Sequence, residues 1–236
     1  QRTKDNEKNT SFKNAAHAFS VESVKPKYSY NFSWMGRPII QYPQDIIAMQ
    51  EIIWDIKPDL IIEAGIAHGG SLIYYASILE LLSISELSEG SVLAVDIDIR
   101  EHNRKEIESH PMSKRIEMIQ GSSVSPEIIA EIKKKAAGKN KVLVLLDSNH
   151  THQHVLEELV AYAPLVSKGS YCVVFDTFIE DMPDGSYPDR PWSQGDNPKT
   201  AVWKYLETHP EFEIDKSIQN KLLITVCPDG YLKKIG

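Results

Sequence analysis

A glycine-rich turn between an apolar run and an amphipathic segment constrains the fold of this chain more than any other feature. Residues 59–63 read Asp-Leu-Ile-Ile-Glu, Gly65, Gly69 and Gly70 follow, and residues 72–82 have the apolar spacing of a helix. This pattern predicts a buried strand, a tight turn and a helix. Glycines let the turn approach a ligand closely, and the start of the helix offers free N–H groups.

The spacing of these glycines differs from two common phosphate-binding motifs. A dinucleotide site has G-x-G-x-x-G and a P-loop has G-x-x-x-x-G-K-[ST], whereas this turn has G-x-x-x-G-G-S and no lysine. The pattern E-x-G-x-x-x-G-G-S, from Glu63 to Ser71, resembles the first motif of class I methyltransferases that use S-adenosylmethionine. That resemblance implies that Glu63 holds the amino group of the cofactor and that the glycines face its sulfonium and ribose.

Apolar runs recur along the chain with helical segments between them. The predicted later strands are residues 92–95, 115–119, 142–146 and 171–175, and the predicted helices are residues 46–56, 72–82, 100–109, 126–136, 152–162 and 199–208. Continuous apolar strands belong to parallel sheets with helices on both faces. Residues 212–217 and 222–227 predict an antiparallel hairpin at the sheet edge. The sequence therefore predicts an α/β, Rossmann-like class I methyltransferase sheet of five parallel strands plus a C-terminal antiparallel hairpin.

The N-terminal part of the chain departs from this alternation. Residues 1–27 have weak periodicity, and the aromatic-rich residues 28–43 are broken by glycine and proline, which predicts an ordered loop. We expect an N-terminal extension and aromatic loop at residues 1–45 and an S-adenosylmethionine-binding domain at residues 46–236. The aromatic side chains either pack at the core edge or a subunit interface, or they bind a ligand. The long, proline-rich loop 178–198 is predicted to be a lid or substrate wall.

Composition and charge argue against several classes of protein. The 236 residues have a formal net charge of -7, which argues against a nucleic-acid-binding surface. No apolar run approaches the roughly 18 residues of a membrane span, and the polar first ten residues lack the apolar core of a signal peptide. Cys172 and Cys227 lie in apolar runs, which predicts buried thiols in a reduced, cytoplasmic protein.

Polar side chains end the predicted strands at equivalent points. Ligands of such sheets bind beyond the carboxyl ends of the strands, and these ends carry Glu63, Asp96, Gln120, Asp147 and Asp176. An acid that ends the second strand can accept both ribose hydroxyls, so Asp96 is the first candidate for that role and Asp98 the second. Gln120, Ser122 and their neighbours are predicted to meet an adenine edge.

Three histidines follow Asp147 within seven residues. One interpretation is a metal site, in which Asp147 and Asp176 supply oxygen ligands for Mg²⁺ or Ca²⁺. Another is a general base, since His150 can take a proton from a hydroxyl near neutral pH. The third is that Asn149 or Thr151 caps a helix and the histidines cover its first turn. We prefer the third interpretation for the second and third histidines and leave His150 open.

Several segments together resemble one known family. The similarity to the cephalosporin hydroxylase-like family extends over residues 28–227 and is carried by residues 31–34, 38–41, 57–63 and 65–71 and by the segment that starts at Asp147. Despite its name, that family has a class I S-adenosylmethionine methyltransferase fold and is similar to rhamnosyl O-methyltransferases. The resemblance implies O-methyl transfer and an oligomer formed through the N-terminal part.

The resemblance also implies a divalent cation held by acids after the fourth and fifth strands. Asp147 and Asp176 match those positions, and Mg²⁺ is the expected ion. Family members with a known metal site have an acid next to the matching aspartate, where this chain has Phe175. One ligand is therefore missing, which leaves the metal requirement open.

We therefore predict an S-adenosylmethionine-dependent O-methyltransferase that acts on a hydroxyl of a small molecule or sugar. The predicted catalytic residues are Asp147 and His150, and the predicted metal ligands are Asp147 and Asp176. The residues predicted to bind S-adenosylmethionine are Glu63, Gly65, Ala67, His68, Gly69, Ser71, Asp96, Gln120, Ser122 and Asp147.

Two alternatives use the same fold. A metal-dependent oxygenase needs two histidines and one carboxylate around an open metal position, and Asp147, His150 and His152 are candidates for that set. A non-catalytic partner protein would keep the fold only to support another enzyme. The intact acids at the strand ends argue against this second alternative.

Overall fold

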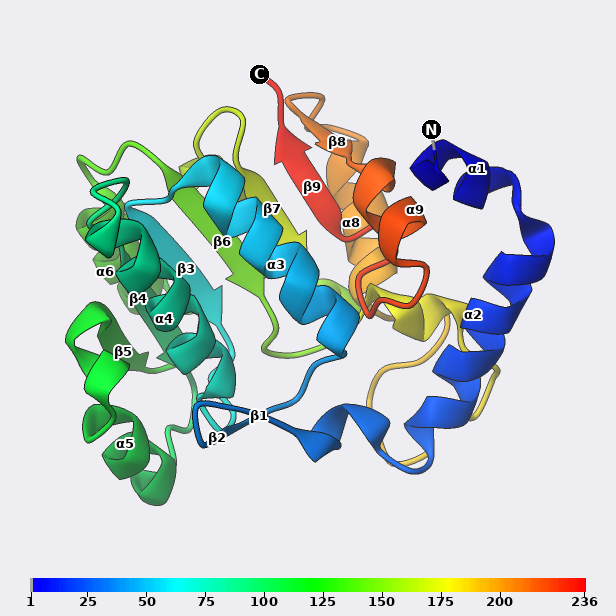
Figure 1. Ribbon diagram of the computed structural model, residues 1–236, viewed down its shortest axis with the longest axis horizontal. Helices are drawn as coiled ribbons and strands as arrows, with labels where there is room; N and C mark the ends of the chain where they lie inside the picture. Colours follow the sequence, from blue (N-terminus) through cyan, green and yellow to red (C-terminus); the bar gives the residue numbers. More distant parts are fainter. Residues whose placement is uncertain (1) are drawn as a thin grey trace.

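A sheet of seven strands lies between two layers of helices in the computed structural model, which describes residues 2–236 (Figure 1). The predicted parallel strands are confirmed as β3 (Leu60–Ala64), β4 (Ser91–Asp96), β5 (Ile116–Gln120), β6 (Val142–Leu146) and β7 (Tyr171–Val174). With β8 (Phe212–Ile214) and β9 (Tyr231–Lys234), the spatial order is β5-β4-β3-β6-β7-β9-β8. The chain fills one side of β3 first and then crosses to β6, so the exits of β3 and β6 form the switch point where ligands of such sheets bind.

Alternation along the strands separates two apolar cores, as the prediction of helices on both faces requires. Ile61 packs in the core that contains α3 (Pro43–Ile56) and α4 (Gly70–Ile84). Leu60 and Ile62 pack in the core that contains α6 (Pro126–Ala136), α7 (His152–Tyr162) and α8 (Pro198–Leu206). Because side chains alternate across a strand, Glu63 points to the same side as Ile61, toward α4.

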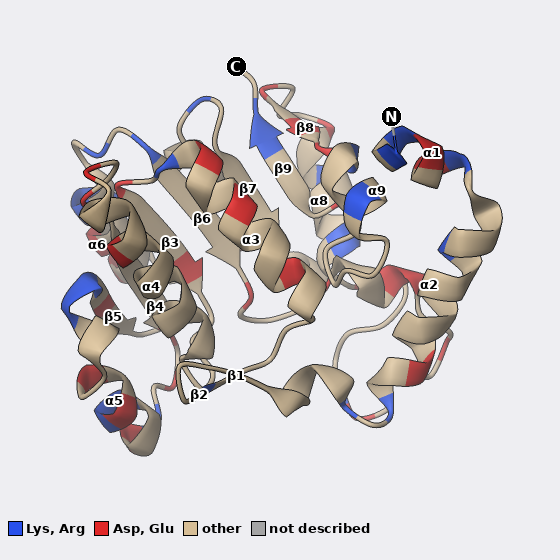
Figure 2. Ribbon diagram, viewed as in Figure 1, with Lys and Arg blue, Asp and Glu red and all other residues tan. Residues whose placement is uncertain are grey.

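The remaining helices and four 3-10 turns complete the described part of the chain. They are α1 (Arg2–Lys8), α2 (Thr10–Val24), α5 (Glu101–Glu108), α9 (Lys216–Leu222) and the 3-10 turns η1 (Tyr28–Asn31), η2 (Pro111–Arg115), η3 (Ala163–Leu165) and η4 (Thr177–Asp181). Figure 2 shows Lys and Arg interspersed with Asp and Glu over the molecule as a whole. Within residues 2–236, no helix has the length and apolar character to span a membrane. Both cysteines are free and buried, as predicted.

The predicted hairpin of residues 212–217 and 222–227 is wrong in its second strand. β8 is followed by α9, and β9 inserts between β7 and β8, antiparallel to both. Residues 222–227 instead wrap around the buried carboxylate of Asp45, which accepts hydrogen bonds from Thr225 Oγ1, from the N–H of Val226 at 3.0 Å and from Tyr231 Oη at 2.9 Å. A buried charge of this kind needs several donors, and a regular strand would not supply them.

The prediction of an irregular loop at residues 28–43 is wrong in part. This segment contains a hairpin of β1 (Phe32–Trp34) and β2 (Arg37–Ile39), joined by Met35 and Gly36, both with positive φ. Two such residues make the tight turn that suits paired strands. Trp34 packs edge-on against Tyr74 of α4, with ring centroids 4.8 Å apart. The hairpin therefore covers the start of α4. The predicted domain boundary between residues 45 and 46 stays a prediction. Gln1, the first residue of the predicted N-terminal extension, lies outside the described residues.

Candidate functional site

The glycine turn lies at the switch point because two backbone segments approach each other there. The N–H of Asp147 donates to the carbonyl of Ala64, at the end of β3, at 2.8 Å. Gly65 has a φ of 101°, and a Cβ on it would lie 2.1 Å from the Asp147 carbonyl oxygen. A Cβ on Gly70 would lie 2.1 Å from the carbonyl oxygen of Pro38. These two glycines therefore admit neighbouring backbone, a reason that the sequence pattern did not reveal.

Side chains from three segments fasten the turn. Asp96 accepts from the N–H of Ile66 through Oδ2 at 2.8 Å and from the N–H of Asp98 through Oδ1 at 3.0 Å. Arg37 Nη2 and Asn103 Nδ2 donate to turn carbonyls at 2.6 and 2.9 Å. Asp96 thus shapes the turn, and its predicted ribose contact stays a prediction. Sequence reasoning misses Arg37 and Asn103, because nothing in one sequence links those positions to residues 67 and 68.

Glu63 is a buried carboxylate with one unpaired oxygen. The hydroxyl of Ser71 donates to Oε2 at 3.0 Å, whereas Oε1 has no hydrogen-bond partner within residues 2–236. Burial raises the pKa of Glu63 from 4.5 to about 8, against the opposing effect of the Ser71 hydrogen bond. A buried, unpaired acceptor suits an ammonium group, which the amino-acid end of S-adenosylmethionine carries. The residue therefore fits the role predicted for it.

A cavity of about 40 Å³ adjoins the turn, lined by residues 38–41, residues 65–71 and Asp147. The predicted cofactor residues in this lining are Gly65, Ala67, His68, Gly69, Ser71 and Asp147. Gln120 and Ser122 lie outside it, at the exit of β5, and Gln120 Oε1 accepts from Arg104 at 3.2 Å. Their adenine contacts stay predictions.

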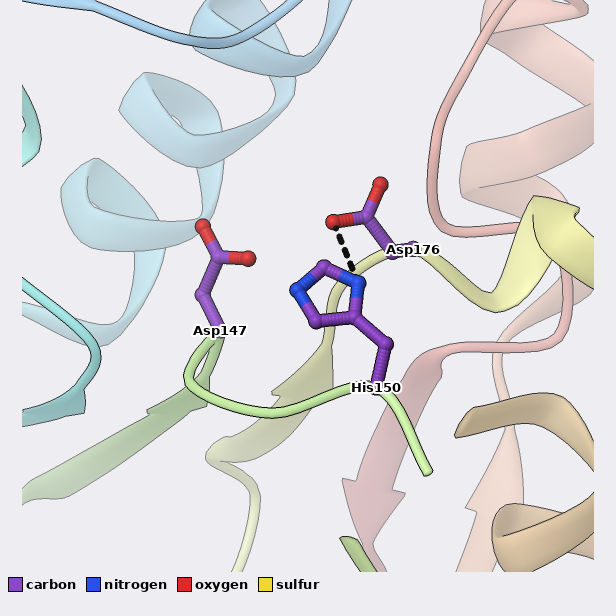
Figure 3. Close-up of side chains that lie close together, drawn as sticks. All are labelled: Asp147, His150 and Asp176. Atoms are coloured by element: carbon purple, nitrogen blue, oxygen red, sulfur yellow. Dashed lines mark ion pairs between the residues drawn. The ribbon is translucent and has the colours of Figure 1, made fainter. Parts of the chain in front are cut away.

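Asp147, His150 and Asp176 come together beyond β6 and β7, and Figure 3 shows the imidazole between the two carboxylates. His150 Nδ1 lies 3.0 Å from Asp176 Oδ2, and one ligand atom from each of the three residues lies within 4.8 Å of the others. The indole of Trp192 stacks on the imidazole, with ring centroids 4.7 Å apart. Asp176 and Trp192 therefore fix the orientation of the His150 imidazole from two sides.

Burial and mutual repulsion set the charges of this cluster. Burial raises the pKa of Asp147 well above its ordinary value, and the negative charge of Asp176 raises it further. Burial lowers the pKa of His150, but the carboxylates of Asp176 and Asp147 outweigh this effect, and the net shift is upward. A proton is therefore held readily within the cluster.

The other two histidines have separate partners. His152 Nδ1 lies 2.8 Å from Thr200 Oγ1, and His154 Nε2 lies 3.3 Å from Glu158 Oε1. Neither belongs to the group of potential metal ligands found among residues 2–236. The ligand set that an oxygenase needs is therefore not formed by Asp147, His150 and His152, because His152 faces α8 instead of Asp147.

The same cluster offers ligands for a divalent cation. Two carboxylates and one imidazole form a donor set that Mg²⁺ or Mn²⁺ accepts. Phe175 is 2% exposed and packs in the core of α3 and α4, so no third carboxylate comes from this position. The residues fit a cation that keeps several water ligands.

The fold and the glycine turn define a class I methyltransferase that uses S-adenosylmethionine. A family model described as Rhamnosyl O-methyltransferase/CmcI matches residues 26–235, and the chain belongs to this family. The predicted family resemblance and fold class are thereby confirmed. The protein is an S-adenosylmethionine-dependent O-methyltransferase.

Individual relatives support this family membership. The Rhamnosyl O-methyltransferase of Mycobacterium tuberculosis is 30% identical over 205 residues, which are 85% of this chain and 77% of the relative. The enzyme of that name from Mycobacterium leprae is 29% identical over 202 residues, which are 85% and 82% of the two chains. A CmcI structure with Mg and SAM has a TM-score of 0.61 at 16% identity and covers 88% of this chain and 78% of its own. That likeness supports the fold.

Cofactor binding should release a proton from Glu63. Because the pKa of about 8 exceeds the ordinary 4.5, the free protein carries a neutral Glu63 at pH 7. A bound ammonium favours the carboxylate, so affinity for S-adenosylhomocysteine should rise with pH up to about 8, by at most about tenfold per pH unit. Calorimetry at pH 7 in buffers of different ionisation enthalpy measures the released proton. Glu63→Gln should release none, and release unchanged in this variant would contradict the assignment.

Proposed function

We propose that the protein methylates a hydroxyl of a saccharide or another small molecule, with His150 as the general base. The position of His150 carries this proposal. Its Nδ1 faces Asp176 at 3.0 Å, which leaves Nε2 as the nitrogen that takes a proton from the acceptor. Relatives named Rhamnosyl O-methyltransferase support a sugar as the acceptor.

The roles of the residues follow from this arrangement. The cofactor supplies an activated methyl group on its sulfonium. Glu63 and Ser71 hold its amino-acid end, and the acceptor hydroxyl lies against His150. As the acceptor oxygen attacks, Nε2 takes the proton and Asp176 stabilises the imidazolium through Nδ1. Because transfer requires oxygen, carbon and sulfur in line, positioning by these side chains contributes most of the acceleration.

Loop residues 182–197 form the proposed acceptor wall. Tyr187 packs against the α3 and α4 core, and its hydroxyl is buried without a hydrogen-bond partner among the described residues. Burial raises the pKa of Tyr187, and the charge of Asp176 adds to the effect, so the hydroxyl stays protonated. It can therefore donate to a polar acceptor that lies near Asp176.

Asp147 and Asp176 would hold Mg²⁺ if the reaction uses it. The ion would lower the pKa of the acceptor hydroxyl as a Lewis acid. With phenylalanine at position 175, this chain offers no carboxylate beside Asp176.

Assembly and compartment belong to the same proposal. Phe12 of α2 is half-exposed, and the helix buries only Ala16, Ser20 and Ser23 against the rest of the chain. Phe19 of the same helix packs on Tyr28 and Tyr42, so Phe12 is the α2 side chain on which we base the proposed homo-oligomer formed through the N-terminal part. The two free thiols fit a reducing compartment such as the cytoplasm.

The acceptor class is testable with labelled S-adenosylmethionine. We expect methyl transfer to deoxyhexosyl glycosides such as rhamnosides, detected by mass spectrometry of the product. Catechol serves as the non-sugar control. Label transfer to catechol alone would refute the saccharide acceptor, and no transfer to any hydroxyl compound would refute the wider proposal.

Replacing His150 by glutamine should remove the base and keep a polar side chain beside Asp176. We expect kcat to fall by roughly 10²- to 10⁴-fold, with affinity for S-adenosylhomocysteine unchanged. Stopped-time assays and calorimetry measure the two quantities. His152→Gln, outside the cluster, is the matched control and should keep full activity. Equal loss in both variants would show that His150 has no special role.

Restoring an acid at position 175 should strengthen metal binding. Wild-type protein should bind Mg²⁺ weakly, and Phe175→Glu should tighten binding by roughly tenfold or more, because Mg²⁺ prefers carboxylate ligands. Calorimetric titration with MgCl₂ measures this, with Phe175→Leu as the apolar control. If glutamate brings no gain while the variant stays folded, Asp147 and Asp176 are not a metal site.

A further inference from the structure

Gln41 is a buried amide with no well-formed hydrogen bond. It lies between β2 and α3, is 2% exposed, and neither Nε2 nor Oε1 has a hydrogen-bond partner within residues 2–236. Buried side-chain amides are almost always hydrogen-bonded, because an unpaired one loses its contacts with water and gains none in exchange. Both unpaired atoms of Gln41 therefore indicate a ligand that supplies a donor and an acceptor.

The surroundings of Gln41 identify where that ligand lies. Gln41 lines the cavity of about 40 Å³ together with the glycine turn and Asp147. Tyr75 is fully buried on α4 beside the amide of Gln41, although its hydroxyl makes no well-formed hydrogen bond among the described residues. Burial raises the pKa of Tyr75 and the charge of Glu63 raises it further, while the neighbouring Gln41 amide acts against this rise. Three unpaired groups, those of Gln41, Tyr75 and Glu63, thus belong to one region of the molecule.

The start of α4 adds donors to the same cavity. Gly69 is the N-cap of this 15-residue helix, and no side chain caps its first amides. Gly69, Gly70 and Ser71 all line the cavity. Uncapped amides at a helix start attract a negative group. They lie beside the neutral donors of Gln41 and Tyr75 and near the carboxylates of Glu63 and Asp147.

One chemical group matches this arrangement, a zwitterionic α-amino acid. Its ammonium needs carboxylates, which Glu63 and Asp147 supply, and its carboxylate needs donors. The cavity lining contains no lysine or arginine and has one histidine, His68, so neutral amides and hydroxyls are most of its donors. The amide of Gln41 provides one N–H donor and one carbonyl acceptor at this place.

We infer that Gln41 is a specificity residue that recognises the α-amino-acid end of the cofactor, with Nε2 donating to its carboxylate. The inference rests on the placement of the cofactor at the glycine turn. Gln41 precedes the first helix of the sheet domain and is outside the glycine motif. Recognition of the amino-acid end thus comes partly from the N-terminal segment, and Tyr75 assists from α4.

One ligand with the amino-acid end and one without it distinguish a role of Gln41 in recognising that end from the binding of the cofactor as a whole. S-adenosylhomocysteine has the amino acid, and 5′-methylthioadenosine lacks it while keeping the adenosine and the thioether. Calorimetry on Gln41→Leu should show S-adenosylhomocysteine weakened by roughly 10- to 100-fold, the size expected for a lost hydrogen bond to a charged group. The affinity for 5′-methylthioadenosine should match that of the wild type.

Matched variants guard against indirect effects. Gln44→Leu removes another buried, unpaired amide oxygen, three residues away and outside the cavity lining, and should change neither affinity. Gln41→Leu should not lower the melting temperature of the ligand-free protein, and Gln41→Glu should weaken S-adenosylhomocysteine further by repelling its carboxylate.

Two outcomes would overturn the inference. Equal weakening of both ligands in Gln41→Leu, or no weakening of either, would show that Gln41 does not recognise the amino-acid end. A wild-type protein that binds neither ligand would instead overturn the cofactor site itself, and this inference with it.

Discussion

The close contact of two backbones at the exits of β3 and β6 is the constraint on which the site depends. The hydrogen bond from Asp147 to Ala64 and the absence of a side chain at Gly65 let the loop after β6 cross the glycine turn. This contact places Asp147 at the cofactor cavity and, three residues later, His150 beside Asp176. A larger residue at position 65 would separate the cofactor half of the site from its acceptor half.

Charge explains why such a site stays open for ligands. Glu63, Asp147 and Asp176 converge with one histidine as their ionisable partner within the cluster. Each buried polar atom left without a partner costs about 1–3 kcal/mol, and the protein leaves several here. A ligand that carries an ammonium and a carboxylate would relieve this cost at Glu63 and Gln41. The carboxylates of Asp147 and Asp176 separately suit a divalent cation.

The sequence predicted the helices and strands that a local pattern of residues is enough to specify. Apolar runs defined all five parallel strands, and strand-end position predicted the approach of Asp147 and Asp176. The predictions were less complete where contacts between residues far apart in the sequence determine the structure. Residues 222–227 look like a strand but wrap around Asp45, which lies about 180 positions earlier in the chain. Asp96 looked like a ribose ligand, yet it also binds turn amides, because a strand-end acid does not reveal which donors lie nearest.

The N-terminal segment packs directly against the glycine turn and the cavity beside it. Arg37 of β2 fastens the turn through the carbonyl of His68, and residues 38–41 supply one wall of the cavity. Pro38 approaches Gly70 so closely that a side chain at position 70 would collide with the hairpin backbone. Ser23 of α2 in turn bonds the hydroxyl of Tyr42, next to Gln41, at 2.5 Å. Through this hydrogen bond α2 is linked to the residue next to Gln41, and so to one wall of the cavity.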